Sequence, residues 1–122
     1  MTDKRKIIIY IEDDYQAALL GKVFLERANY LVEICLNTEQ ARTILDKKIP
    51  DMIITDVGLP GENGIQFYEW VKSSHFKEIP ILIVSAHAVG FHEVLTTHRD
   101  IFFEKPIFFP KLIDKIREIL GS

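Results

Sequence analysis

Residues 51–64, DMIITDVGLPGENG, place a carboxylate at the point where a short apolar run ends. Residues 52–55 predict a buried strand, and the glycine- and proline-rich residues after Asp56 predict a loop. An ionised carboxylate at the edge of an apolar interior needs a cation or hydrogen-bond donors around it. The function of the chain therefore depends on what Asp56 faces.

Four further apolar runs, too short for helices, predict strands at residues 6–11, 31–36, 81–84 and 101–103. Helical spacing predicts helices that begin near Tyr15, at Asn37 or Thr38, after Gly64 and near Pro110, with a short helix at residues 89–95. The expected buried face of the first helix comprises Ala17, Leu20, Gly21, Phe24 and Ala28. Strands that are apolar throughout and alternate with helices indicate an α/β chain, a single doubly wound (βα)5 domain with a parallel sheet covered on both faces.

The 122 residues carry a net charge of −3, from 15 basic and 18 acidic side chains. No basic stripe is visible, so direct nucleic-acid binding is not expected, and the Lys4-Arg5-Lys6 cluster is interpreted as a solvated lead-in to the first strand. No apolar run approaches the roughly 18 residues that cross a bilayer. The single cysteine, Cys35, excludes an internal disulfide and favours a cytoplasmic protein.

Polar residues follow four of the predicted strands, and they are Glu12, Asp13, Asp14, Asp56, Ser85 and Lys105. Because ligands of open α/β sheets bind outside the carboxyl ends of the strands, these residues are expected on one rim. Crowded carboxylates repel unless a cation is bound, and an all-oxygen ligand set favours Mg²⁺ or Mn²⁺. Asp56 is the best nucleophile for an aspartyl phosphate, Glu12 and Asp13 are the better metal ligands, and Asp14 is interpreted as a helix cap. Lys105 and Ser85 offer a charge and a hydroxyl to phosphoryl oxygens.

The segments IIIYIEDD, IITDVGLPGENG, ILIVSA and FFEKPI, in this order, resemble the receiver domain of bacterial two-component response regulators. The resemblance covers essentially the whole chain and implies a flavodoxin-like sheet of strand order 2-1-3-4-5. It implies that Asp56 accepts a phosphoryl group from a phosphohistidine on a sensor histidine kinase or phosphotransfer protein. Glu12, Asp13 and the backbone carbonyl of Gly58 would then position Mg²⁺ beside Asp56.

The resemblance also implies a conformational switch. Ser85 would hydrogen-bond the phosphoryl group, Lys105 would form a salt bridge to it, and Phe102 would rotate into the space that Ser85 vacates. The Lys105-Pro106 bond would be cis. The surface of helix four, strand five and helix five would change and contact a downstream protein, and the domain would be a monomer or a weak phosphorylation-dependent dimer.

The chain departs from the family's pattern in several places: the segment from Ser85 to Lys105 is a little short, and His98-Arg99-Asp100 replaces the common Gly-Ala-Asp before the fifth strand. Gly58 stands where a larger residue is more usual, and His87 follows Ser85 by two residues, so both are expected to tune the lifetime of the phosphorylated state. Phenylalanines around the fifth strand are expected either in the core or in an exposed partner patch, and these are Phe102, Phe103, Phe108 and Phe109.

Competing functions remain open. The first is a signalling switch spanning residues 1–122 with no output domain, or a receiver excised from a longer regulator or hybrid histidine kinase. Such a domain is not an enzyme beyond catalysing its own phosphotransfer and dephosphorylation. The second is a Mg²⁺-dependent phosphohydrolase with Asp56 as nucleophile, although no cap domain or second acid for general base chemistry is visible. The third is a flavin or nucleotide binder, whose phosphate the acidic first loop would repel.

Overall fold

The computed structural model describes residues 3–86 and 101–121. Its five parallel strands are β1 (Ile7–Ile11), β2 (Leu31–Cys35), β3 (Met52–Asp56), β4 (Ile81–Ser85) and β5 (Phe102–Glu104). They form one sheet in the order β2-β1-β3-β4-β5, which confirms the predicted fold class and strand order. The helices within the described ranges are α1 (Tyr15–Arg27), α2 (Thr38–Leu45), α3 (Gly64–Lys72) and α5 (Phe109–Leu120). The helix expected at residues 89–95 lies outside the described residues.

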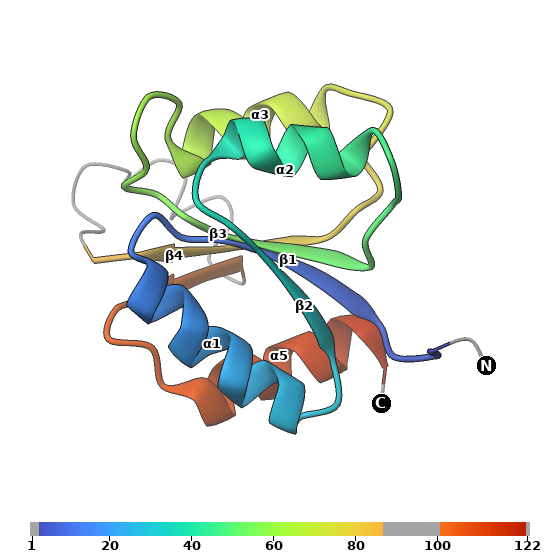
Figure 1. Ribbon diagram of the computed structural model, residues 1–122, viewed down its shortest axis with the longest axis vertical. Coiled ribbons are helices and arrows are strands. Elements are labelled where there is room, and N and C mark those ends of the chain that lie inside the picture. The colour runs from blue at the N-terminus through green and yellow to red at the C-terminus, as the bar shows by residue number, and fades with distance from the viewer. Residues whose placement is uncertain (1–2, 87–100, 122) are drawn as a thin grey trace.

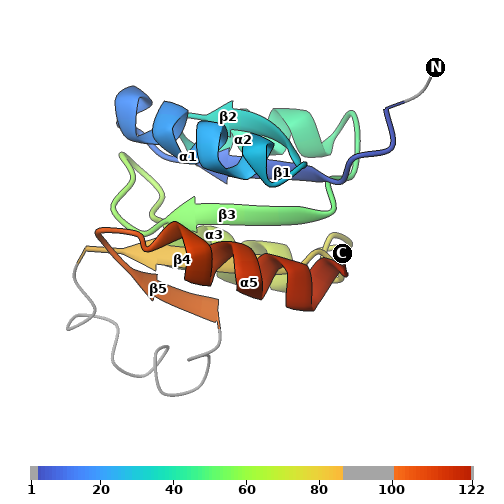
Figure 2. The same ribbon diagram turned by 90° about the horizontal axis from the view of Figure 1, so that it is seen from below.

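The helices cover both faces of the sheet, with α2 and α3 on one face and α1 and α5 on the other (Figure 1). Figure 2 shows the same arrangement after a quarter turn. Successive strand residues point to opposite faces, so Ile53 of β3 packs with α2 and α3 while its neighbour Ile54 packs with α1 and α5. Because both faces are covered, the inner strands β3 and β4 are buried along their whole length.

Side-chain caps begin the helices close to the predicted positions. The Asp14 carboxylate accepts hydrogen bonds from two backbone N–H groups in the first turn of α1, so it is the predicted helix cap. The Asn37 side chain accepts from Gln40 N–H at 2.8 Å, which decides between Asn37 and Thr38 as the cap of α2. Asn63 and Gln66 cap α3 reciprocally. These caps fix where the chain turns from each strand end into the next helix.

The predicted buried face of α1 is right at Gly21, which is buried, and at Phe24 and Ala28, which pack against the core, but it is wrong at Leu20. Ala18 and Leu25 are buried beside Gly21, whereas the side chain of Leu20 is 53% exposed. Apolar residues occur nearly all round this helix, so their spacing does not select one face. The consequence is a stripe of exposed apolar side chains, here named the α1 stripe, made of Tyr15, Leu19, Leu20 and Val23.

The phenylalanines around β5 divide between core and surface. Phe109 is buried and stacks on Phe24 of α1 with ring centroids 4.4 Å apart, whereas Phe108 is 66% exposed. Phe102 and Phe103 are half-buried. No helix in the described parts of the chain is long and apolar enough to cross a membrane.

Candidate functional site

Three carboxylates meet at the carboxyl edge of the sheet. Strands β1 and β3 are parallel neighbours, so the residues that end them emerge side by side. One carboxylate oxygen from each of Glu12, Asp13 and Asp56 lies within 4.8 Å of the other two. Glu12 and Asp56 are buried and Asp13 is exposed. The structure therefore brings together the three acids that the sequence placed on one rim.

The ammonium group of Lys105 lies against two of these acids. Its Nζ atom is 2.6 Å from Glu12 Oε1 and 3.0 Å from Asp56 Oδ2. The backbone N–H of Lys105 donates to the carbonyl of Ser85 at 2.9 Å, which continues the pairing of β5 with β4 and sets the direction of the lysine. The Lys105-Pro106 peptide bond is cis, as the resemblance implied.

Burial and charge act in opposite directions on these groups. Burial raises the pKa of Glu12, and the nearby Asp56 raises it further, although Lys105 opposes the rise. The pKa of Lys105 is also raised, because its hydrogen bonds to Glu12 and Asp56 outweigh the effect of burial. The lysine therefore carries its positive charge among the acids.

The charge count of the site fits a divalent cation. Three ionised carboxylates and one ammonium group sum to −2, and Glu12, Asp13 and Asp56 together offer only oxygen ligands. Hard divalent ions such as Mg²⁺ and Mn²⁺ bind oxygen ligands of this kind. Gly58 N–H lies 3.4 Å from Asp56 Oδ1, while metal binding by the Gly58 carbonyl stays a prediction.

A hollow of about 420 Å³ opens beside Asp56. Gly58, Ser85 and Lys105 contribute to its walls. A Cβ atom added at Gly58 would meet nothing within 4 Å, so the hollow is open on that side. Ser85 is 5% exposed, whereas Phe102 packs half-buried against the core cluster on the α2 and α3 face. His87 lies outside the described residues.

Sequence reasoning missed one residue that shapes the site, Gly64. A Cβ atom there would lie 2.1 Å from the backbone oxygen of Asp56 and 3.0 Å from Val57 Cα. The Gly64 N–H donates to the carbonyl of Val57 at 3.0 Å. The start of α3 therefore packs directly on the backbone that carries Asp56. The signal in the sequence was a glycine at the first position of the helix, directly after the capping residue Asn63, where a close approach to another segment requires the absence of a side chain.

Residues 8–117 match the response regulator receiver domain family. The chain belongs to this family. The polar-differentiation response regulator DivK of Brucella anthropi is 26% identical over 120 residues, which cover 96% of this chain and 98% of DivK. The transcriptional regulatory protein CpxR of Escherichia coli is 30% identical over 115 residues, which cover 93% of this chain but 48% of CpxR.

A solved receiver domain of a signal transduction histidine kinase from Syntrophus aciditrophicus is also similar. It has a TM-score of 0.86 at 26% identity, covering 95% of this chain and 90% of that one. Membership of the family makes this receiver domain a phospho-accepting switch of two-component signalling and not a conventional enzyme. Relatives of the receiver domain thus include a protein of its own length and a protein about twice as long.

Proposed function

We propose that Asp56 is the phosphoacceptor of this receiver domain and that Lys105 and Ser85 bind the transferred group. One observation carries the choice of Asp56 among the three acids. Asp56 both contacts Lys105 and lines the open hollow, whereas Glu12 and Asp13 are not among the described residues that line it. A phosphoryl group that enters the hollow would therefore meet the Asp56 carboxylate together with an ammonium donor.

The proposed step is transfer from a phosphohistidine. A carboxylate oxygen of Asp56 forms a bond to phosphorus as the phosphorus–nitrogen bond breaks, and the electron pair of that bond stays on the imidazole nitrogen. Lys105 neutralises charge on the phosphoryl oxygens, and the Ser85 hydroxyl donates a hydrogen bond to one of them. Mg²⁺, which Glu12, Asp13, Asp56 and the Gly58 carbonyl would hold, supplies further charge neutralisation.

The proposed output is a change at the far edge of the sheet. Ser85 moves toward the phosphoryl group and Phe102 rotates inward, so that the surface of helix four, β5 and α5 contacts a downstream protein. Support comes from Phe102 itself, which is only half-buried and lies on a strand of three residues at the edge of the sheet. The part of this surface within residues 87–100 lies outside the described residues.

The proposed phosphoryl donor is a sensor histidine kinase or a phosphotransfer protein, and the α1 stripe offers it a contact surface. The stripe begins at Tyr15, three residues after Glu12, so a protein docked on it would lie beside the acids. Contiguous exposed apolar patches often mark sites of protein–protein contact, whereas single exposed apolar residues scattered over a surface do not. Leu19→Ser is therefore expected to slow transfer from a phosphohistidine protein while leaving phosphorylation by a small acyl phosphate unchanged.

Two molecular contexts are compatible with the relatives. DivK is matched along nearly its whole length and illustrates a stand-alone receiver such as residues 1–122, while CpxR and the histidine-kinase receiver illustrate a receiver within a longer protein. The proposal includes a cytoplasmic location, which the single, buried cysteine supports. It also includes a monomer or a weak phosphorylation-dependent dimer.

Intact mass after incubation with a small acyl phosphate and Mg²⁺ tests the proposal. We expect one phosphoryl addition, which Asp56→Asn abolishes and chelation of the metal prevents. Asp46→Asn, at an exposed residue that ends α2, is the matched control and should behave like the unmodified protein. Phosphoryl addition that survives in Asp56→Asn would show that another residue is the acceptor.

A further inference from the structure

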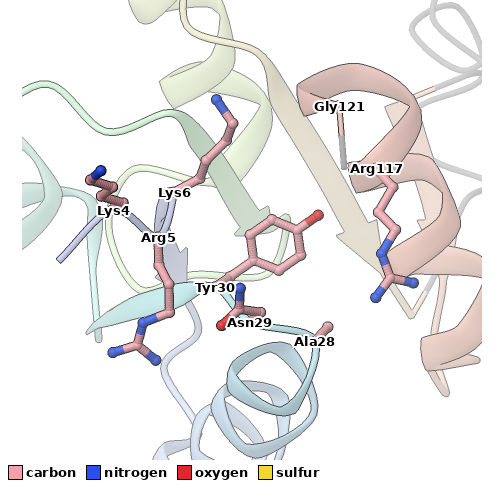
Figure 3. Close-up of a pocket in the computed structure, with 8 residues that line it drawn as sticks. All are labelled: Lys4, Arg5, Lys6, Ala28, Asn29, Tyr30, Arg117 and Gly121. Atoms are coloured by element: carbon pink, nitrogen blue, oxygen red, sulfur yellow. The ribbon is translucent and has the colours of Figure 1, made fainter.

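A second hollow, of about 360 Å³, lies at the opposite edge of the sheet from Asp56. Its walls come from the lead-in to β1, the turn between α1 and β2, and the last turn of α5 (Figure 3). The start of β1 and the end of α5 lie at the same end of the sheet (Figure 1). Because the strands are parallel, this end is the amino edge, so the hollow is separated from the acids by the length of the sheet. We call it the amino-edge hollow.

Backbone hydrogen bonds hold the walls of this hollow. Leu31 N–H donates to the carbonyl of Lys6 at 2.9 Å, and Gly121 N–H donates to the carbonyl of Arg117 at 2.8 Å. Tyr30 is 5% exposed, and Figure 3 shows its hydroxyl on the side toward Arg117. Burial raises the pKa of Tyr30, with Arg117 opposing the rise, so the phenol stays protonated and can donate.

The charges around the amino-edge hollow do not cancel. Its described lining contains four basic side chains and no acidic one. Arg5 is neutralised by Asp3, since its Nη2 atom lies 2.8 Å from Asp3 Oδ2. The other three form no ion pair with any residue in the described ranges, and they are Lys4, Lys6 and Arg117.

The helix ends nearby reduce this positive charge without removing it. Helices α1 and α5 both end at the hollow, and a helix carboxyl end contributes roughly −0.5 of an elementary charge. Two such ends against three unpaired cations leave about two positive charges on the lining, which the nearby Glu26 carboxylate, whose charge acts on Arg5, reduces to between about one and two. This excess stands out on a chain whose net charge is −3. The hollow is therefore a place where anions would concentrate, at the far end of the molecule from the acidic site.

We propose that the amino-edge hollow binds a small ligand that carries two or more phosphate groups. Its volume falls at the lower end of the range for small-molecule sites, about 300–1,000 Å³. The Arg117 guanidinium can bind phosphate oxygens in pairs, and Lys4 and Lys6 add point charges from the other side of Tyr30. Inorganic polyphosphates and nucleotides share this chemistry, so the test includes both. The sequence pattern alone had suggested only a solvated lead-in at Lys4-Arg5-Lys6.

Isothermal titration with inorganic tripolyphosphate tests the proposal on the full chain. EDTA is present throughout, so that metal-dependent binding at the acids does not contribute. The double variant Lys6→Gln/Arg117→Gln is expected to bind at least about tenfold more weakly, because it loses two charge-assisted contacts. The matched control is Lys111→Gln/Lys115→Gln, which removes the same charge from α5 outside the hollow and should retain the affinity of the unmodified protein.

Nitrogen-15 chemical shifts locate the bound probe. We expect tripolyphosphate to shift the backbone amide signals of Lys6, Asn29, Tyr30 and Gly121 and to leave that of Asp56 in place. A parallel titration with ATP separates the two sources, since tighter binding of ATP than of tripolyphosphate indicates a nucleotide and equal binding indicates the phosphate chain alone. The proposal fails if tripolyphosphate does not bind, if the control variant loses affinity as much as the double variant, or if only anionic vesicles or DNA bind.

Discussion

Replacing Gly64 by alanine tests how the backbone around Asp56 is held. The new Cβ would lie 2.1 Å from the Asp56 carbonyl oxygen, whereas ordinary contacts begin near 3.4 Å. A displacement of about 1.3 Å is then required, and the obstacle is backbone that cannot swing aside as a flexible side chain could. Gly64 does not lie in the left-handed region of backbone conformation, so close approach alone explains the need for glycine.

The expected loss of stability follows from three contributions. Overpacking of this kind costs roughly 1–3 kcal/mol. Weakening the hydrogen bond from Gly64 N–H to the Val57 carbonyl costs roughly 1 kcal/mol more. Alanine returns at most about 1 kcal/mol through its higher helix propensity. The net destabilisation is about 1–3 kcal/mol, which for a chain of this length lowers Tm by roughly 4 °C per kcal/mol.

Two other glycines of the same loop serve as controls. A Cβ at Gly58 meets nothing within 4 Å, so Gly58→Ala should change the free energy of unfolding by less than about 0.5 kcal/mol. Gly61 has φ +72°, and Gly61→Ala should cost about 1 kcal/mol from backbone conformation alone. Urea denaturation measures all three variants, and intact mass follows their phosphorylation. Only Gly64→Ala should also slow phosphoryl addition. Equal stability of Gly64→Ala and Gly58→Ala would refute the packing argument.

Three further substitutions probe other contacts. Gly21→Ala would place Cβ 2.5 Å from a ring carbon of the buried Tyr10, and urea denaturation should show a loss of about 1–3 kcal/mol; unchanged stability would contradict this packing. Arg42→Ala removes a guanidinium 4.4 Å from the ring of Trp70, the sole tryptophan, and should cost about 1 kcal/mol and shift its fluorescence emission. Gly58→Met should lengthen the phosphorylated lifetime severalfold by shielding the hollow from water, as measured by intact mass after donor removal; an unchanged decay rate would exclude that role.

The rim of acids and the lysine could be predicted because parallel topology converts sequence position into spatial position. Once residues 6–11, 52–55 and 101–103 are recognised as strands, the residues after them must emerge at one edge. Glu12, Asp56 and Lys105 meet there, although residues 12 and 105 are 93 positions apart in the chain. Distances and relative exposure could not be predicted in this way, because they depend on side-chain packing around each strand end.

The orientation of α1 illustrates why the packing of the helices on the sheet could not be predicted from the sequence. A helix that is apolar on several faces carries no periodic signal for the face that packs, and the choice between Ala18 and Leu20 depends on the shape of the sheet beneath. Gly21 lies on both the predicted and the observed face, and its close contact with the ring of Tyr10, which fills the space where a Cβ atom would stand, shows how one contact fixes the packing of the helix. Such a contact pairs two residues from different elements and leaves no mark in the spacing of either one.

The charge count of the acidic site links its geometry to its dependence on a metal. With three carboxylates and one ammonium group, the site carries −2 before any phosphoryl group arrives, and the donor brings further negative charge. Lys105 is already shared between Glu12 and Asp56, so it cannot neutralise the incoming oxygens without weakening one of those ion pairs. A divalent cation held by the acids would restore neutrality and leave the lysine free to face the phosphoryl oxygens. The number of charges that the strand ends bring together therefore leads us to expect that phosphorylation depends on Mg²⁺.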